Sequence, residues 1–212
     1  VNMVDREIGQ ILDLLKELRI DDNTMVIVSG DNGGNSYFKN ETHPHGFFAP
    51  NVDPKTGKVF RGQKGLLYEG GLRVPFIVRW PGRIKAGSVS DHLGYFPDMM
   101  PTLAEAAGVD CPESIDGISL LATLIGQKAA GHKQEDHEYL YWEYMDQTAV
   151  RCGNWKAYKP RKGPWELYDL GRDIEEKENV AAQNPAILDK MTRYAAQAHQ
   201  PHVPGDIVDT EL

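Results

Sequence analysis

The stretch MVIVSGDNGG, residues 25–34, constrains the fold most, because an apolar run ends abruptly in an acid, an amide and two glycines. Met25–Val28 is short and rich in β-branched residues, which suits a strand buried on both faces. Before it, apolar residues recur at helical spacing from Val4 to Leu18, with charged residues on the other face. An amphipathic helix, a polar turn and a buried strand together predict an α/β layer.

The residues that end this strand are candidates for a ligand site. In open α/β sheets, ligands bind at the carboxyl ends of strands, where glycine lets the backbone approach a ligand closely. Asp31 and Asn32 lie at such an end, and their oxygens are hard ligands suited to Ca²⁺ or Mg²⁺. The alternative interpretation is an Asx turn, because Asp-Asn-Gly-Gly is also good turn chemistry.

A second cluster, RGQKGLLYEGGLRVPF at residues 61–76, gathers cations among glycines in a chain that is acidic elsewhere. Its cations are Arg61, Lys64 and Arg73. Glycine-rich backbone with interspersed cations suits an oxyanion cradle, in which a lysine offers a compact charge to a phosphate or sulfate oxygen. A solvated turn with a few basic residues is the alternative interpretation.

The remaining elements follow from periodicity and turn residues. Residues 36–64 have no sustained period, and loops of this length in compact domains are usually functional or disordered. After Gly126, four short aromatic runs separated by turn formers indicate a small antiparallel sheet, and Asn184-Pro185 then indicates the start of a helix. The other elements expected are a strand at 74–80, helices at 98–107 and 118–125, and a domain boundary near 127–136.

Composition excludes some classes of protein. The formal net charge of −8 argues against a general nucleic-acid binder, since a phosphate-binding surface usually needs a basic excess. No run approaches the roughly 18 consecutive apolar residues of a membrane-spanning helix. Cys111 and Cys152 are isolated, without metal-binding spacing, and are interpreted as buried small residues rather than as a disulfide or ligands.

Together, the two clusters resemble a known family. DNTMVIVSGDNGG followed by FRGQKGLLYEGGLRVPFIVRWPG is similar to the C-terminal part of the sulfatase core, in the alkaline phosphatase superfamily. The resemblance continues through YFPDMMPTLAEAAGV, DGISL, TAVRCGNWKAY and ELYDLGRDIEEKENVA, and so covers nearly the whole chain. The resemblance implies an α/β fold. Residues 1–130 would form the C-terminal part of an alkaline-phosphatase-like core, with a mixed sheet flanked by helices. Residues 131–212 would form a small α+β subdomain with an antiparallel sheet and a helix.

The resemblance also implies an activity, the hydrolysis of sulfate esters. It implies that Asp31 and Asn32 are two of the ligands of a divalent cation, Ca²⁺ with Mg²⁺ as the alternative. Lys64 matches the family's lysine that contacts the sulfate and offsets charge at the scissile ester. The expected substrate is a sulfated small molecule or carbohydrate.

Other residues have more than one interpretation. Arg61 is a further candidate for substrate binding, as are His43 and His45 in the long loop, for which exposed loop histidines are the alternative. Glu69 is expected to be structural, and Asp98 is expected to cap a helix rather than bind metal. Three further candidates could reach the rim of the pocket from the small sheet: Trp142, Glu143 and Arg151. The preferred interpretation is that these residues belong to an aromatic core and a surface ion pair.

Part of the implied site is missing. A sulfatase needs a formylglycine made from Cys or Ser in a C/S-x-P-x-R motif, and neither Cys111 nor Cys152 lies in that motif. We therefore expect the nucleophile and the other metal ligands in an N-terminal part of the same protein, before Val1, and expect this chain alone to be inactive, to bind Ca²⁺ weakly and to self-associate through exposed apolar surface. Two alternatives stay open: a phosphonate or phosphodiester hydrolase of the same superfamily, and a non-catalytic binding remnant.

Overall fold

The computed structural model describes residues 2–35, 41–42 and 51–201, and the chain forms two compact units. The first unit comprises residues 1–31 and 74–138, and the second comprises residues 32–73 and 139–212. The segment that carries Lys64 therefore packs with the C-terminal third of the chain. The domain boundary predicted between residues 130 and 131 stays a prediction.

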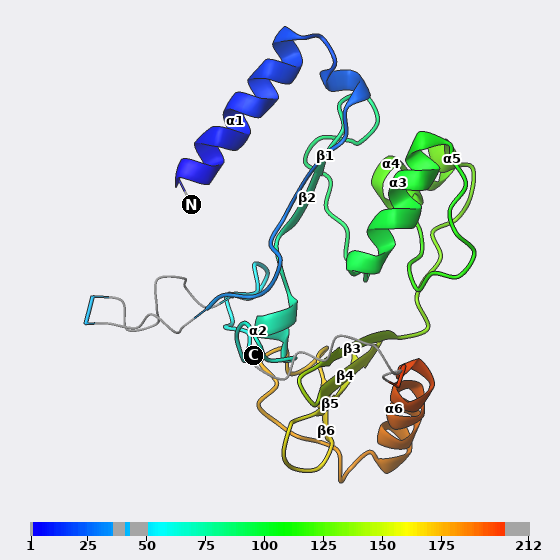
Figure 1. The fold of residues 1–212 in the computed structure, drawn as a ribbon. Helices are drawn as coiled ribbons and strands as arrows, with labels where there is room; N and C mark the ends of the chain where they lie inside the picture. Colours follow the sequence, from blue (N-terminus) through cyan, green and yellow to red (C-terminus); the bar gives the residue numbers. More distant parts are fainter. Residues whose placement is uncertain (1, 36–40, 43–50, 202–212) are drawn as a thin grey trace. The chain divides into compact units, whose positions relative to one another are not determined.

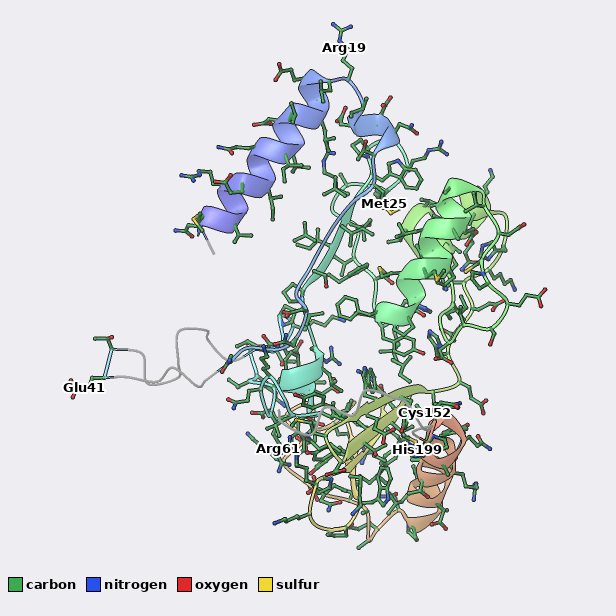
Figure 2. The ribbon with its side chains drawn as sticks, viewed as in Figure 1. Arg19, Met25, Glu41, Arg61, Cys152 and His199 are labelled. Carbon is green, nitrogen blue, oxygen red and sulfur yellow. The ribbon has the colours of Figure 1, made fainter. Side chains whose placement is uncertain are left out.

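The first unit begins with α1 (Asn2–Glu17), which confirms the predicted amphipathic helix, and continues through a 3-10 turn, η1 (Asp21–Asn23). Side chains project from α1 all around its axis (Figure 2), and none of its residues is buried. No helix among the described residues is long and apolar enough to cross a membrane.

The strand that ends in Gly-Asp-Asn is β1 (Val26–Ser29), and it pairs antiparallel with β2 (Phe76–Arg79), as Figure 1 shows. Both strands were predicted, but the expected mixed sheet is not found among the described residues, where β1 and β2 form a sheet of two strands. The expected burial of β1 on both faces is also wrong: Val26, Ile27 and Val28 are only half-buried. Because no third strand flanks the pair in the described part of the chain, apolar side chains stay open to solvent, and Ile77 is 61% exposed.

Short helices complete the first unit. The predicted helix over 98–107 is confirmed, and it ends at Gly108, whose left-handed backbone (φ 68°) lets its N–H reach the carbonyls of Ala104 and Glu105. The helix expected at 118–125 is shorter than predicted. The bounds are η2 Phe96–Asp98, α3 Met99–Ala107, α4 Leu121–Ile125 and α5 Gln127–Ala130.

The second unit contains the predicted small antiparallel sheet. Its four strands pair in chain order, each with the next. Because side chains alternate along a strand, one face of the sheet presents Ala149 and Tyr158, which are register partners, and the other presents Val150 and Ala157. The strands are β3 Leu140–Tyr144, β4 Gln147–Cys152, β5 Trp155–Lys159 and β6 Glu166–Asp169.

A helix covers one face of this sheet. Met191, Tyr194 and Ala195 of α6 (Pro185–Ala198) pack against Val150 and its neighbours (Figure 1). Asn184 occupies the N-cap position and Pro185 the first turn, as predicted, but the Asn184 side chain donates to the Val180 carbonyl instead of capping the helix.

The segment from residue 61 to residue 73 covers the opposite face. Leu67 and Tyr68 are buried against Ala149, Tyr158 and Tyr168, just before the short helix α2 (Glu69–Leu72). The four-stranded sheet is therefore packed between α6 and the segment that carries Lys64.

Candidate functional site

The chain after β1 enters a tightly packed turn. Asp31 is exposed, Asn32 is half-buried and Gly33 is buried. The Gly33 N–H donates to the Gly71 carbonyl at 2.9 Å, and an added Cβ at Gly33 would lie 1.8 Å from the Gly70 carbonyl oxygen. Glycine is required at position 33 because the backbone of residues 70–71 occupies the space of a side chain.

Lys64 lies in a loop with glycine on both sides. Gly62 (φ 83°) and Gly65 (φ 85°) both adopt left-handed backbone, so the loop turns sharply on either side of the lysine. Lys64 itself is exposed, and its backbone N–H donates to the Gly34 carbonyl at 3.0 Å.

These contacts bring the two sequence clusters together. Two backbone hydrogen bonds, Gly33 to Gly71 and Lys64 to Gly34, join residues 32–34 to the segment that carries Lys64, although the bonded residues are about thirty to forty positions apart in the sequence. Asp31 immediately precedes Asn32 in the chain. The fold thus fixes the backbone of one candidate metal ligand next to the backbone of the candidate sulfate-binding lysine.

The donor types at positions 31 and 32 fit a hard cation. A carboxylate and a side-chain carbonyl are oxygen ligands of the kind that Ca²⁺ and Mg²⁺ prefer. Within residues 2–35, 41–42 and 51–201, no group of three or more His, Cys, Asp or Glu side chains is placed to hold a metal ion. That Asp31 and Asn32 are two of the ligands of a divalent cation stays a prediction.

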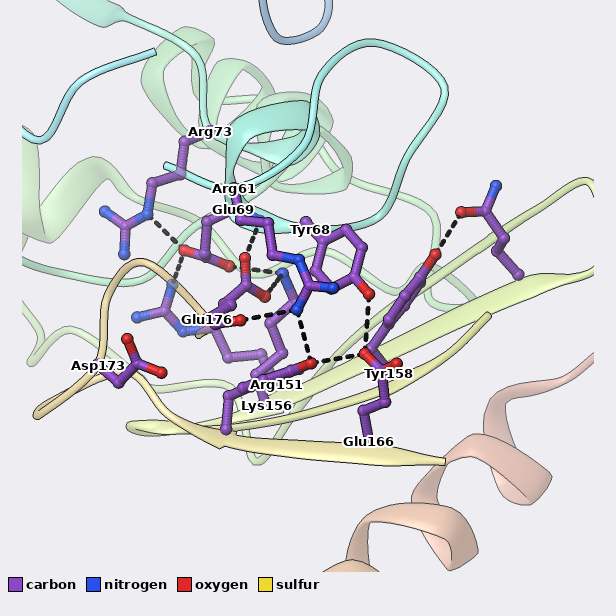
Figure 3. A network of polar contacts seen from close by, with 12 residues as sticks. Arg61, Tyr68, Glu69, Arg73, Arg151, Lys156, Tyr158, Glu166, Asp173 and Glu176 are labelled. Atoms are coloured by element: carbon purple, nitrogen blue, oxygen red, sulfur yellow. Dashed lines mark hydrogen bonds and ion pairs between the residues drawn. The ribbon is translucent and has the colours of Figure 1, made fainter. Parts of the chain in front are cut away.

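A buried charge network lies between the Lys64 segment and the sheet (Figure 3). Glu69, 2% exposed, forms ion pairs with Lys156 at 2.9 Å, with Arg151 at 3.3 Å and with Arg73. Burial alone would raise the pKa of Glu69, but these three cations outweigh it and lower the pKa to about 2. Glu69 thus has the structural role expected for it, and Arg151 forms a largely buried ion pair in place of the surface pair expected.

Glu176 completes this network from the segment after β6. Its carboxylate pairs with Lys156 at 2.8 Å and accepts the backbone N–H of Glu69 at 2.7 Å. Burial raises the pKa of Glu176, and the attraction of Lys156 offsets only part of this effect. Because Lys156 and Glu176 are both fully buried, the network ties α2 firmly to β5.

Arg61 is held by protein groups. Its guanidinium lies over the Tyr68 ring, 4.0 Å from the centroid, and donates to the Tyr168 hydroxyl at 2.9 Å and the Glu176 carbonyl at 2.7 Å (Figure 3). These contacts give Arg61 a structural role in the described part of the chain, and its substrate contact stays a prediction. His43 and His45 lie outside the described residues.

The remaining candidates also contact protein groups. Asp98 is fully buried and occupies the N-cap position of α3, but its side chain does not cap that helix; it accepts the backbone N–H groups of Tyr95, in the capping box of η2, and of Ile118. Trp142 packs at the edge of the core around Tyr158, and Glu143 accepts the Tyr141 hydroxyl. Both cysteines are free and only partly buried, and Cys152 packs against the core around Val150.

Sequence reasoning missed Lys156 and Glu176. Lys156 lies in the run NWKAYK, where a lysine among aromatic residues looks like a solvent-facing position of an amphipathic strand, and Glu176 lies in the acidic run DIEEKE. The only available signal was strand alternation, which places Lys156 on the same face as Tyr158.

Family comparison gives a consistent assignment along the chain. The sequence model of the family described as sulfatase matches residues 1–109, and that described as N-sulphoglucosamine sulphohydrolase, C-terminal, matches residues 60–199. The N-acetylgalactosamine-6-sulfatase of Canis lupus familiaris is 32% identical over 209 residues, which cover 97% of this chain and 37% of the relative.

Solved structures agree with this assignment. The crystal structure of Ps i-CgsB has a TM-score of 0.71 at 29% identity, covering 92% of this chain and 40% of that one. A second structure, of BT4656, described as in complex with its substrate D-glucosamine-2-N,6-O-disulfate, has a TM-score of 0.68 at 26% identity, covering 92% of this chain and 37% of that one. The chain thus spans about two fifths of the length of these relatives and shares part of their fold. Two family models that together cover residues 1–199 place the chain in the sulfatase family.

Proposed function

We propose that this chain is the C-terminal part of a sulfatase that hydrolyses sulfate esters of carbohydrates. The family assignment supports the reaction, because the matched relatives are named as sulfatases. The substrate class rests on the relative whose described substrate is a disulfated glucosamine. The complete protein would include a further N-terminal part, since this chain spans 37% of the dog enzyme's length.

The observation that carries the proposal is the backbone pairing of the two motifs. The Gly33 to Gly71 and Lys64 to Gly34 hydrogen bonds fix Asn32 and Lys64 on adjacent backbone segments. Asn32, as a ligand of a cation, and Lys64, through its ammonium group, can then act on the same sulfate ester. An arrangement of this kind, fixed by the fold before substrate arrives, is what electrostatic catalysis needs.

The residues of this chain have distinct roles in the proposed reaction. When present, a formylglycine from outside this chain supplies the nucleophile, and a bound divalent cation offsets negative charge. Lys64 places its ammonium group against a sulfate oxygen. Negative charge grows on the ester oxygen as the S–O bond breaks, so a fixed ammonium stabilises the transition state more than the ground state. Asp31 and Asn32 supply oxygens to Ca²⁺, or to Mg²⁺ in the alternative.

Two further contacts belong to the proposal. One of His43 and His45 contacts the sulfated substrate or protonates the leaving oxygen. Arg61 contributes positive potential near the substrate from its place over Tyr68, where it also has its structural contacts.

The proposal is tested by sulfate release from p-nitrophenyl sulfate and from glucosamine 6-sulfate. The complete protein, expressed from a reading frame that extends upstream of Val1, is compared with its Lys64→Ala and Asp31→Ala variants, with and without Ca²⁺. We expect each substitution to lower kcat/KM by about 10²- to 10³-fold, as for loss of one electrostatic contact to the transition state. Lys58→Ala is the matched control, because Lys58 is an exposed lysine that lies just before this segment in the chain.

Other outcomes would contradict the proposal in different ways. Faster turnover of p-nitrophenyl phosphodiesters or phosphonates than of the sulfate esters would assign the protein to the phosphonate or phosphodiester hydrolases. No turnover of any ester, with a folded protein, would favour a non-catalytic binding role. Equal losses in Lys58→Ala and Lys64→Ala would show that general charge, rather than the position of Lys64, matters.

A further inference from the structure

Gln147 is a buried polar residue whose position the hairpin before it determines. It opens β4 after a two-residue turn, in which Met145 (φ 45°) and Asp146 (φ 60°) both have the left-handed backbone of a type I′ turn. Gln147 is 1% exposed and pairs in register with Tyr144. Strand alternation places it on the same face as Ala149, the face that the Lys64 segment covers.

The nitrogen and the oxygen of the Gln147 amide both have hydrogen-bond partners in this buried site. Its Nε2 donates to the Gly65 carbonyl at 3.0 Å and to the Tyr144 carbonyl at 3.4 Å, and its Oε1 accepts the Tyr158 hydroxyl at 2.7 Å. Tyr158, which is 2% exposed, therefore orients the amide through its hydroxyl so that Nε2 faces the Gly65 and Tyr144 carbonyls. A buried amide without these partners would be costly, so the three bonds act as one unit.

This unit reaches the residue next to Lys64. Gly65 directly follows Lys64, so the loop is fixed on both sides of the lysine: the Lys64 N–H binds the Gly34 carbonyl, and the Gly65 carbonyl binds Gln147. A lysine side chain has four rotatable bonds, and the space its ammonium group can reach depends on where its backbone is anchored.

We propose that Gln147 is a positioning residue for Lys64: with Tyr158, it holds the Gly65 carbonyl and so fixes the lysine against Gly34. This inference rests on the proposed function of Lys64 at the sulfate. Gln147 contacts no substrate and acts only through the loop. Through this contact, the C-terminal sheet sets the backbone position of Lys64, a residue more than eighty positions earlier in the sequence.

The structural half of the inference is tested on the 212-residue chain by amide hydrogen exchange. Gln147→Met keeps the length of the side chain and removes both donors, and Tyr158→Phe removes only the hydroxyl that orients the amide. We expect the Lys64 amide to exchange about tenfold faster in Gln147→Met and less so in Tyr158→Phe, with the amides of Ala157 and Leu167 unchanged. Thr148→Val, at the next residue on the opposite face, is the matched control and leaves exchange at Lys64 unchanged.

The functional half is tested in the complete protein. We expect Gln147→Met to lower kcat about tenfold, and the double variant Lys64→Ala/Gln147→Met to be no slower than Lys64→Ala alone, because Gln147 acts through the lysine. If Gln147→Met does not fold, Tyr158→Phe gives the same comparison at smaller amplitude.

Two results would overturn the inference, and they differ from failure of the proposed function. Unchanged Lys64 exchange in a folded Gln147→Met chain would overturn the positioning contact. A wild-type kcat for Gln147→Met, when Lys64→Ala is inactive, would overturn its importance for catalysis. Full activity of Lys64→Ala would instead overturn the proposed function, and the inference with it.

Discussion

Gly33 is the position at which the two motifs touch most tightly, and its substitution provides the sharpest test of their pairing. Gly33→Ala would place a methyl group 1.8 Å from the Gly70 carbonyl oxygen, so the backbone of one segment must move. We expect the free energy of unfolding to fall by about 1–3 kcal/mol, measured by urea denaturation.

Gly30→Ala is the matched control for this prediction. An added Cβ at Gly30 would lie 3.5 Å from the Val74 Cβ, an ordinary van der Waals contact in the same motif. It should leave the midpoint of unfolding nearly unchanged. Equal destabilisation by the two substitutions would mean that Gly33 does not pack against Gly70 as described.

Glu69 makes stability depend on pH in a predictable direction. Its pKa is about 2 in the folded chain and about 4.5 without the fold, because its three cations outweigh the effect of burial. A depressed pKa contributes stability that is fully present above pH 4.5 and is lost as the pH falls through 2. We expect urea denaturation to show that Glu69→Gln is less stable at pH 7 and loses less stability than the parent chain between pH 4.5 and 2.

The raised pKa of Glu176 works in the opposite direction and offsets part of this effect, because its protonation favours the folded state. Glu178→Gln is the control, since Glu178 is exposed in the same acidic run. A loss of stability in acid that is as steep in Glu69→Gln as in the parent chain would contradict the assignment.

The sequence points more readily to residues with an obvious chemistry, whose roles stay predictions, than to the buried polar residues that pack beside them. Asp31 and Lys64 stand out because an acid ends a strand and a lysine interrupts glycines. Gln147 and Lys156 do not stand out, because their burial depends on a segment that covers the sheet from far away in the sequence. A polar residue on a strand looks solvent-facing until the partner of that face is known.

Strands and helices were predicted well where local signals were strong. Four aromatic runs separated by turn formers became β3–β6, and Pro185 marked the start of α6. Burial could not be predicted as well for β1, because an apolar strand does not specify what covers it. In the structure, β1 pairs only with β2 among the described strands and keeps its apolar residues half-buried.

The first unit exposes much of its apolar surface. On α1, Val4, Ile11 and Leu14 are each more than half exposed, and on β2, Ile77 is 61% exposed. Exposed apolar side chains in this number mark an interaction site or a tendency to aggregate, and an open two-stranded sheet adds unpaired edges. We therefore predict that the 212-residue chain self-associates in solution and binds dyes that report exposed apolar surface.

Light scattering across a concentration series measures this association directly. Leu14→Lys and Ile77→Lys together should shift the chain toward the monomer without lowering its stability, because neither side chain is buried. Lys16→Leu, which enlarges the apolar surface of the same helix, should shift the chain toward larger species. A monodisperse parent chain that binds no dye would contradict this prediction, because it would show that the apolar side chains of α1 and β2 are covered in solution.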